Sequence, residues 1–282
     1  MITPSQWRDS GTFVELRGYR MFYRREGTGP TLLLVHGYPT SSWDWEKTWA
    51  VLATHYDVIA MDMLGFGESA KPKGHRYSLI EQTDLHLELL AKLGVTAFHA
   101  LVHDYGVTVG QELLARGAAV ASIAFLNGGL FPEMHRARPI QKLLASPLGP
   151  LVAAVMSERS FAKSFAPLFV TPPSREELHA FFTLATQHGG KRALADLISY
   201  MAERREKRER WVGAFVATKV PLIVINGSQD PVSGAHLADR VLELRPGTPL
   251  VRLPNAGHYP QVEAPREVLD AYLAFRRGLE TR

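Results

Sequence analysis

The sequence predicts an α/β fold with a mainly parallel sheet that is covered by helices on both faces. Short, continuously apolar stretches such as 31–35 and 220–225 lack the polar alternation of a half-exposed strand, and this pattern is typical of strands buried on both faces. Stretch 79–93 instead has apolar residues at helical spacing, and Gly94 ends it. Strands and helices that alternate in this way favour a parallel sheet with right-handed crossovers.

The composition is that of an ordinary globular protein. The chain has 282 residues, no cysteine, a formal net charge of +4 and a pI near 9.3. The lack of cysteine excludes disulfides, thiolate metal sites and cysteine nucleophiles, and the small positive charge is weak support for a nucleic-acid or membrane partner. The longest apolar run is far shorter than the ~20 residues of a membrane span, and residues 1–10 lack an apolar secretory segment. We therefore expect a cytoplasmic protein, monomeric or homodimeric, that needs no cofactor.

The elements of the core can be assigned one by one from their patterns. Phe13–Leu16 and Met21–Tyr23 alternate around Gly18, which predicts an antiparallel hairpin at a sheet edge. The aromatic-rich stretch Trp43–Ala53 predicts a helix whose N-cap is Ser41 or Ser42. The other predicted strands are 58–61, 100–103, 122–126 and 249–253, and the other predicted core helices are 108–116, 235–244 and 265–279.

The alternation of strands and helices stops between residues 130 and 212. This stretch has no strand candidate, its prolines cluster, and helical patterns such as 175–188 and 191–210 dominate. We interpret it as a helical lid inserted into the sheet domain. Its charged run 203–210 has opposite charges at helical spacing, which favours a solvated helix face. The predicted organisation is a first core part at 1–129, the lid at 130–212 and a second core part at 213–282.

Asp104 occupies the most informative position in the chain. Strand 100–103 runs directly into it, and Gly106 and a predicted helix follow. A strand that turns sharply into a helix presents the turn residue at the top of the sheet, which is the geometry of a nucleophile elbow. An aspartate before a glycine is also a common turn or N-cap residue. The loops after the other strands therefore decide between the two interpretations.

Two further loops carry residues that would complete a catalytic triad. Asp230 lies in the loop after strand 220–225, and His258 lies in the loop after strand 249–253. In a parallel sheet, functional residues gather beyond the carboxyl ends of the strands, where all three loops lie. The chain order of nucleophile, acid and histidine therefore predicts that Asp104 is a nucleophile.

These residues carry a resemblance to α/β-hydrolases with an aspartate nucleophile, the epoxide hydrolases and haloalkane dehalogenases. HGYP at 36–39 matches their H-G-x-P loop, and HDYG at 103–106 is similar to their H-D-W-G elbow. Within this group the chain most resembles the mesoderm-specific transcript proteins and their bacterial relatives, through NGGLFPEMHR at 127–136 and RERWVGA at 208–214. The resemblance covers nearly the whole chain. It implies the α/β-hydrolase fold, with a mainly parallel eight-stranded sheet and an inserted helical cap.

The resemblance also implies a mechanism for an epoxide substrate. Asp104, as an ionised carboxylate, would attack an epoxide carbon and form an ester. His258, oriented by Asp230, would then activate the water that hydrolyses this ester. The backbone N–H groups of Tyr38 and Tyr105 occupy the matching positions for an oxyanion hole.

Epoxide hydrolases protonate the departing oxygen with tyrosines of the lid, and Tyr200 is similar to one of these. Trp211 follows it by eleven residues, so the two would share one face of a continuous helix. No tyrosine lies between Tyr105 and Tyr200, so the usual first lid tyrosine has no counterpart. For a small apolar substrate, the expected pocket residues are His36, Phe161, Phe165 and Trp211.

Two other functions remain open at the level of the sequence. A haloalkane or haloacid dehalogenase would use the same nucleophile, but this chain has Tyr105 and Tyr38 where haloalkane dehalogenases carry a halide-holding tryptophan and, often, an asparagine. A catalytically weak relative that binds an apolar ligand would be consistent with the missing lid tyrosine. It would also be consistent with Val102 and Val107, which stand where the family prefers small residues around the elbow.

A metal site is not expected. His99 and His103 have the spacing of a metal pair only on a helix, and on a strand they would lie ~13 Å apart. We therefore interpret His103 as a structural residue.

Overall fold

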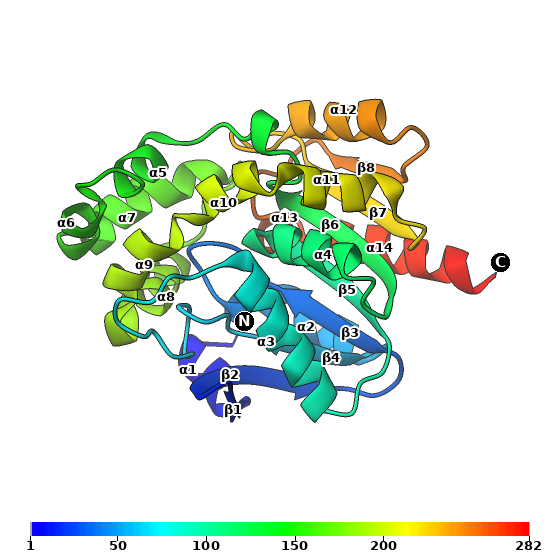
Figure 1. Cartoon of the computed structure of the whole chain (residues 1–282), viewed down its shortest axis with the longest axis horizontal. Helices are drawn as coiled ribbons and strands as arrows, with labels where there is room; N and C mark the ends of the chain where they lie inside the picture. Colours follow the sequence, from blue (N-terminus) through cyan, green and yellow to red (C-terminus); the bar gives the residue numbers. More distant parts are fainter. Residues whose placement is uncertain (1, 282) are drawn as a thin grey trace.

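The computed structural model describes residues 2–281 and contains one eight-stranded sheet, as the sequence predicts (Figure 1). The strand order is β1-β2-β4-β3-β5-β6-β7-β8. The β1–β2 and β2–β4 pairs are antiparallel, and every other neighbouring pair is parallel. The strands are β1 Thr12–Leu16, β2 Tyr19–Glu26, β3 Thr31–Val35, β4 Asp57–Met61, β5 Phe98–Asp104, β6 Val120–Gly128, β7 Leu222–Gly227 and β8 Leu250–Leu253.

The predicted hairpin forms the antiparallel edge of the sheet. Its turn consists of Arg17 and Gly18, with φ angles of 50° and 79°. A two-residue turn with positive φ at both positions matches the twist of the flanking strands. The hairpin therefore begins the sheet at the edge opposite to β8.

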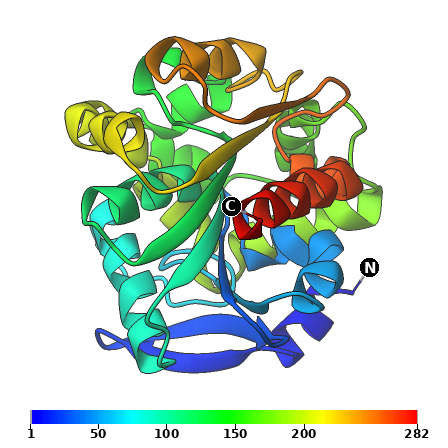
Figure 2. The ribbon, with the colours of Figure 1, turned by 90° about the vertical axis from the view of Figure 1, so that its right-hand side faces the viewer.

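The central strands are buried because helices cover both faces of the sheet. All residues of β4 and β5 are buried, as are four of the five residues of β3. Figure 2 shows α2 and α14 on one face and α3, α4 and α11 on the other. The helices of these layers are α2 Glu46–Ala53, α3 Leu79–Lys92, α4 Tyr105–Ala115, α11 Arg208–Ala217, α12 Ala235–Leu244 and α14 Pro265–Glu280; the short helices α1 Pro4–Asp9 and α13 Pro260–Glu263 complete the core.

The helix predicted at Trp43–Ala53 begins as a tighter turn. Residues Ser42–Trp45 form a 3₁₀ helix that leads into α2, and the Ser41 hydroxyl accepts a hydrogen bond from the Trp43 N–H at 3.3 Å. Ser41 is therefore the capping residue of the two serines proposed.

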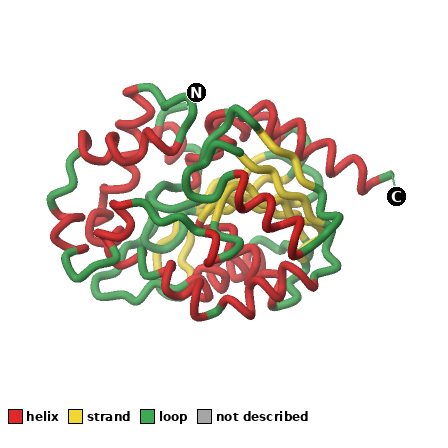
Figure 3. Tube along the Cα trace, turned by 90° about the horizontal axis from the view of Figure 1, so that it is seen from above, coloured by secondary structure: helices red, strands yellow, loops and turns green. Residues whose placement is uncertain are grey.

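The segment between β6 and β7 is helical, as predicted, and lies at one end of the molecule, where Figure 3 shows helices and loops but no strand. It comprises α5 Pro139–Leu144, α6 Gly149–Ala154, α7 Glu158–Phe165, α8 Arg175–Thr186, α9 Gly190–Leu197 and α10 Tyr200–Glu206, and leads into α11. The predicted boundary after residue 212 falls inside α11, which packs along α4. The division into core and lid stays a prediction.

The single helix predicted over 191–210 is wrong, because the chain breaks it into α9, α10 and α11. The break between α10 and α11 lies at Lys207, where φ −101° and ψ 19° depart from helical values. On either side of it, Arg204 of α10 and Trp211 of α11 both bond side chains of α4, Thr108 and Glu112. No helix within residues 2–281 has the length and apolar character needed to cross a membrane.

Candidate active site

Asp104 lies at a strained turn between β5 and α4. Its backbone has φ 43° and ψ −102°, and α4 begins at the next residue. A positive φ at a residue other than glycine costs free energy and is found where the surrounding structure enforces it. The Asp104 side chain forms no capping hydrogen bond with α4. The interpretation of Asp104 as a plain N-cap residue is therefore wrong.

Two glycines leave the room that this turn needs. A Cβ at Gly106 would lie 2.5 Å from the carbonyl oxygen of Val35. A Cβ at Gly128, at the end of β6, would lie 2.6 Å from Val107 Cγ2 and 2.7 Å from Asp104 Cα. The elbow therefore forms despite Val107, because the space for that side chain comes from Gly128 on the neighbouring strand.

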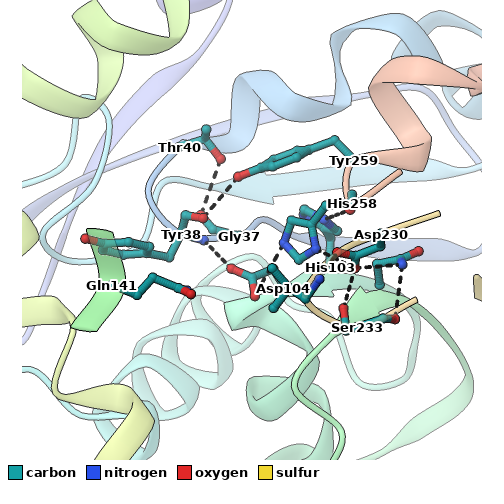
Figure 4. A network of polar contacts seen from close by, with 12 residues as sticks. Gly37, Tyr38, Thr40, His103, Asp104, Gln141, Asp230, Ser233, His258 and Tyr259 are labelled. Carbon is teal, nitrogen blue, oxygen red and sulfur yellow. Dashed lines mark hydrogen bonds and ion pairs between the residues drawn. The ribbon is translucent and has the colours of Figure 1, made fainter. Parts of the chain in front are cut away.

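The Asp104 carboxylate is almost completely enclosed, with 4% of the residue exposed. Its Oδ2 accepts a hydrogen bond from the Tyr38 N–H at 3.0 Å, and its Oδ1 lies 3.8 Å from Nε2 of His258 (Figure 4). Behind the carboxylate, Nη2 of Arg204 donates to the backbone carbonyl oxygen of Asp104 at 2.8 Å. Asp104 is thus held by a backbone donor and an imidazole at its side chain and by a buried cation at its backbone carbonyl.

His258 is oriented by Asp230, as the sequence predicts for a triad. Its Nδ1 lies 2.7 Å from Oδ2 of Asp230, so Nδ1 carries the proton and Nε2 faces Asp104. Its carbonyl oxygen accepts from Nε2 of His103 at 2.8 Å, which gives His103 the structural role expected for it. The two loops approach closely because Gly227 has no side chain; a Cβ there would lie 2.0 Å from the carbonyl oxygen of Gly257.

Asp230 is held by a network of donors. Oδ2 also accepts from the Ser233 hydroxyl at 2.6 Å and from the Asn127 amide at 2.9 Å, and Oδ1 accepts from the Val232 N–H at 2.7 Å. Hydrogen bonds to a carboxylate favour its charged form. Asp230 is therefore a fixed anion that orients the imidazole.

Burial and charge act in opposite directions on the three members of the triad. Burial by itself would raise the pKa of Asp104, but the charges of His258 and Arg204 outweigh it and hold this pKa below the usual value. Burial likewise opposes ionisation of Asp230, yet His258 and the hydrogen bonds of the network keep its pKa well below the usual range. Burial would lower the pKa of His258, but Asp230 and Asp104 raise it overall. Asp104 is consequently ionised at neutral pH.

The Tyr38 N–H, predicted as an oxyanion-hole donor, points at the Asp104 carboxylate. The Tyr259 hydroxyl donates to the Tyr38 carbonyl oxygen at 3.0 Å, which ties this loop to the residue after His258. Tyr105 is the first residue of α4, and the first four N–H groups of a helix have no partner within the helix. The Tyr105 N–H, directly after Asp104, therefore has no partner within α4, and its role in the oxyanion hole stays a prediction.

A small cavity of about 60 Å³ opens onto Asp104 and His258. It is mostly apolar, and Phe161 and Phe165 line it as predicted. Helices α5, α7 and α9 and the loops beside them contribute to the remaining wall, with the polar exceptions Arg138, Gln141 and Ser164. This volume is several times what a cavity needs to hold one water molecule, so the cavity suits a small apolar ligand.

Two residues predicted for the pocket lie elsewhere, and those predictions are wrong. The His36 ring is fully buried: Nδ1 contacts the Gly37 carbonyl oxygen at 2.9 Å, and Nε2 accepts from the Met63 N–H at 3.0 Å, so His36 shapes the loop. The Trp211 indole N–H donates to Glu112 on α4 at 2.7 Å. Trp211 follows Tyr200 on a separate helix, so the shared face expected for the two does not exist.

Tyr200 lies directly behind the cavity wall. The residue is 1% exposed, and its hydroxyl accepts a hydrogen bond at 3.2 Å from Nε2 of Gln141, which lines the cavity. Its ring centroid lies 5.7 Å from that of Tyr38 and 5.2 Å from that of Tyr105. Burial and the charge of Asp104 raise the pKa of Tyr200, so its hydroxyl keeps its proton.

Arg204 and Asn127 belong to the site although the sequence did not single them out. Arg204 is 2% exposed; besides Asp104 it contacts the Thr108 hydroxyl at 2.7 Å and lies 4.5 Å from the centroid of the Tyr200 ring. The prediction of a solvated charged face at 203–210 is therefore wrong at Arg204. The sequence held one signal for Asn127. Asn127 and Gly128 follow the predicted strand 122–126, and this strand ends at the same edge of the sheet as the strands that precede Asp104, Asp230 and His258.

Comparisons with known proteins identify the family of the chain. A family model described as alpha/beta hydrolase fold matches residues 30–265. The putative hydrolase LipZ of Mycobacterium tuberculosis is 39% identical over 286 residues, which cover 98% of this chain and 99% of LipZ. The mesoderm-specific transcript homolog protein of Homo sapiens is 36% identical over 289 residues, which cover 95% of this chain and 86% of that protein.

Solved structures share the fold at lower identity. The haloalkane dehalogenase DbeA from Bradyrhizobium elkani superimposes with a TM-score of 0.83 at 21% identity, covering 96% of this chain and 99% of its own. The epoxide hydrolase CorEH superimposes with a TM-score of 0.78 at 22% identity, covering 95% and 99%. The resemblance carried by HGYP and HDYG is confirmed at the level of family and fold.

Proposed function

The chain belongs to the alpha/beta hydrolase fold family, and we propose that it is an epoxide hydrolase that works through a covalent ester on Asp104. One observation carries the proposal. An ionised, buried carboxylate at the elbow lies 3.8 Å from a histidine nitrogen, and the other nitrogen of that histidine is bonded to Asp230. This arrangement supplies a nucleophile that needs no deprotonation and a base for the second step.

In the first step, Asp104 attacks an epoxide carbon and the ring C–O bond breaks. A carbon–oxygen bond forms to the carboxylate, and the departing oxygen takes up a proton. We assign that proton to the Tyr200 hydroxyl, which keeps it at neutral pH and is bonded to Gln141 at the cavity wall. The cavity places the substrate against the carboxylate and excludes most water, which favours attack over solvent hydrolysis.

In the second step, His258 takes a proton from a water molecule, and the resulting hydroxide attacks the carbonyl carbon of the ester. The C–O bond between that carbon and the substrate oxygen then breaks, and the leaving oxygen takes the proton from His258, which releases the diol. The regenerated Asp104 carboxyl group gives up its proton, which restores the Tyr200 hydroxyl. The Tyr38 N–H already points at Oδ2, and the Tyr105 N–H at the start of α4 completes a pair of donors for the oxyanion. Esterification removes the negative charge of Asp104, which is one of the charges that raise the pKa of His258. The imidazole therefore becomes a neutral base when the ester forms.

A haloalkane dehalogenase is the alternative enzyme, and the positions of the two phenols argue against it. A halide leaving group needs donors that face the nucleophile. Neither phenol is free for this role, since the Tyr105 side chain is hydrogen-bonded to Gln82 and the Tyr38 hydroxyl donates to the carbonyl oxygen of Leu194 at 3.2 Å. The assembled triad also argues against a protein that only binds a ligand, since binding does not require a polarised histidine beside a carboxylate.

A trapping experiment separates these functions. A His258→Gln variant is incubated with a panel of small epoxides and a panel of haloalkanes, and the peptide containing Asp104 is examined by mass spectrometry. We expect an added mass from epoxides alone, and an Asp104→Asn variant serves as the control that cannot form it. An adduct from haloalkanes with halide release would support the dehalogenase instead. Binding of both panels without any adduct would contradict the enzymatic proposals.

A further inference from the structure

Helices α5 and α6 carry an exposed apolar patch at the outer end of the helical segment, where Figure 1 shows them furthest from the C-terminus. Its largest members are Leu143, Leu148, Leu151 and Val155, which are 42%, 58%, 63% and 71% exposed. Four of the eight large exposed hydrophobic residues in the described chain thus fall within thirteen consecutive positions. Alanines and prolines fill the exposed positions between them. We call residues 143–155 the α5–α6 patch.

The side of the α5–α6 patch that faces the protein interior holds the segment in place. Leu144, Ala153 and Met156 are buried, and α6 packs against α9. Leu144 and Met156 also line the cavity that contains Asp104. The exposed and the buried faces of one short helical hairpin therefore separate the surrounding medium from the active site.

The charges around the patch have one sign. Residues 134–157 contain no aspartate or glutamate, but they contain Arg136, Arg138 and Lys142. Arg136 and Lys142 are exposed. The sequence that contains the exposed leucines therefore carries basic but no acidic side chains between Glu133 and Glu158. An apolar surface rimmed by basic side chains is the combination that binds at an anionic lipid interface.

The composition of the patch argues against a protein partner. Protein interfaces are enriched in aromatic residues, methionine and arginine at their centres and depleted in alanine. Residues 143–155 contain no aromatic residue or methionine, and three of them are alanine. Aliphatic side chains without shape-specific anchors suit a fluid hydrocarbon phase.

We propose that the α5–α6 patch docks this protein on the surface of an anionic lipid membrane. Leu148, Leu151 and Val155 enter the boundary between head groups and acyl chains, and Arg136 and Lys142 contact anionic head groups. The hydrophobic and electrostatic contributions add, so binding needs both parts of the patch. The cavity wall then lies directly behind the lipid contact, where apolar molecules are concentrated.

Vesicle cosedimentation tests the proposal without reference to catalysis. The full chain is mixed with vesicles of phosphatidylcholine alone or of phosphatidylcholine with phosphatidylglycerol. We expect binding to the anionic vesicles and at least ~10-fold weaker partitioning for Leu148→Ser/Leu151→Ser, from the apolar area that this variant removes. Lys142→Glu should weaken binding to anionic vesicles about fivefold or more and leave binding to neutral vesicles unchanged.

A matched control is available on other faces of the molecule. Val51 of α2 and Leu242 of α12 are 42% and 39% exposed, so Val51→Ser/Leu242→Ser also removes exposed aliphatic carbon. This control should bind vesicles like the wild type, and far-ultraviolet circular dichroism checks that all variants are folded. Absence of wild-type binding, or equal loss in the control, would overturn the proposal. So would a patch-dependent dimer in sedimentation velocity without vesicle binding, because a second copy would then be the occupant.

Discussion

The guanidinium of Arg204 donates a hydrogen bond to the backbone carbonyl oxygen of Asp104 at 2.8 Å, from a helix one hundred residues further along the chain. The same side chain bonds the Thr108 hydroxyl on α4. A buried cation therefore holds the strained turn beside the Asp104 carboxylate. In the mechanism that we propose, Arg204 acts through Asp104 and is a positioning residue.

Replacing Arg204 should slow ester formation and move its pH dependence. The groups that lower the pKa of Asp104 are His258, Arg204, His103 and the Tyr38 N–H, so Arg204→Met leaves a carboxylate with a higher pKa. We expect ester formation about 10- to 100-fold slower, which corresponds to the ~1.5–3 kcal/mol of a hydrogen bond to a charged group. The acid limb of the pH profile should move to higher pH, as measured by single-turnover kinetics.

Two variants control for a purely structural effect. Arg204→Lys keeps the charge, so its acid limb should stay near that of the wild type even if the rate falls. Arg205→Met removes an exposed arginine from the next position and should change neither quantity. An unchanged acid limb in Arg204→Met would contradict the electrostatic role.

Tyr200→Phe should slow ester formation far more than ester hydrolysis. The phenylalanine keeps the ring packing against Tyr38 and Tyr105 but removes the hydroxyl that we assign as the acid. Loss of general-acid assistance costs about 10²- to 10⁴-fold. Stopped-flow kinetics with an epoxide substrate measure the two steps separately. Tyr23→Phe on β2 is the matched control, and wild-type rates in Tyr200→Phe would remove Tyr200 from the mechanism.

Acidification should separate the two chemical steps. The pKa of Asp104 is lowered, so Asp104 stays ionised at pH values below its ordinary pKa of about 3.9. Ester formation removes the Asp104 charge and so lowers the pKa of His258 from its raised position in the free enzyme, but Asp230 still favours the protonated imidazole. As the pH falls, His258 of the ester is therefore protonated while Asp104 of the free enzyme stays ionised, and the wild type should accumulate the Asp104 ester, which acid quenching and mass spectrometry detect. An ester level that does not rise on acidification would exclude His258 as the base.

Gly128→Ala should destabilise the protein and impair the elbow. The added Cβ would meet Asp104 Cα at 2.7 Å and the Asp104 carbonyl oxygen at 2.8 Å, and these backbone atoms cannot move without shifting the nucleophile. Overpacking of this kind costs about 1–3 kcal/mol. Thermal unfolding and epoxide turnover measure the two effects.

Gly213→Ala is the matched control for Gly128→Ala. A Cβ at Gly213 meets nothing within 4 Å, and the residue lies inside α11. Alanine is a better helix former than glycine by about 1 kcal/mol, so Gly213→Ala should raise the unfolding temperature. Equal unfolding temperatures for the two variants would contradict the crowding at Gly128.

The sheet and the alternation of strands and helices along the chain could be predicted from the sequence, because both depend on local patterns of apolar residues. Continuous apolar stretches mark β3 and β7, and leucines at helical spacing mark α3. The triad candidates were also predictable, since Asp104, Asp230 and His258 all follow such strands. In a parallel sheet, the carboxyl ends of neighbouring strands lie at the same edge, so the loops that follow them are neighbours.

The errors arose where packing across the chain overrides local pattern. Residues 191–210 are helical throughout by local preference, yet the folded chain divides them among α9, α10 and α11, with Lys207 in a non-helical conformation between the last two. Arg204 carries no local sign that distinguishes it from Arg205. Arg204 is buried where it bonds the backbone carbonyl oxygen of Asp104, which lies one hundred positions earlier in the chain.

The sequence by itself determined the fold, the family and the three loops that carry the triad, because strand and helix periodicity and the glycines of tight turns act over short distances. Tertiary structure alone decided that Arg204 lies behind the nucleophile, that Trp211 packs on Glu112 outside the pocket, and that α5 and α6 expose leucines beside the cavity wall. Each of these depends on contacts between segments far apart in the chain. Their free energies are set by burial and hydrogen bonding that no single segment contains.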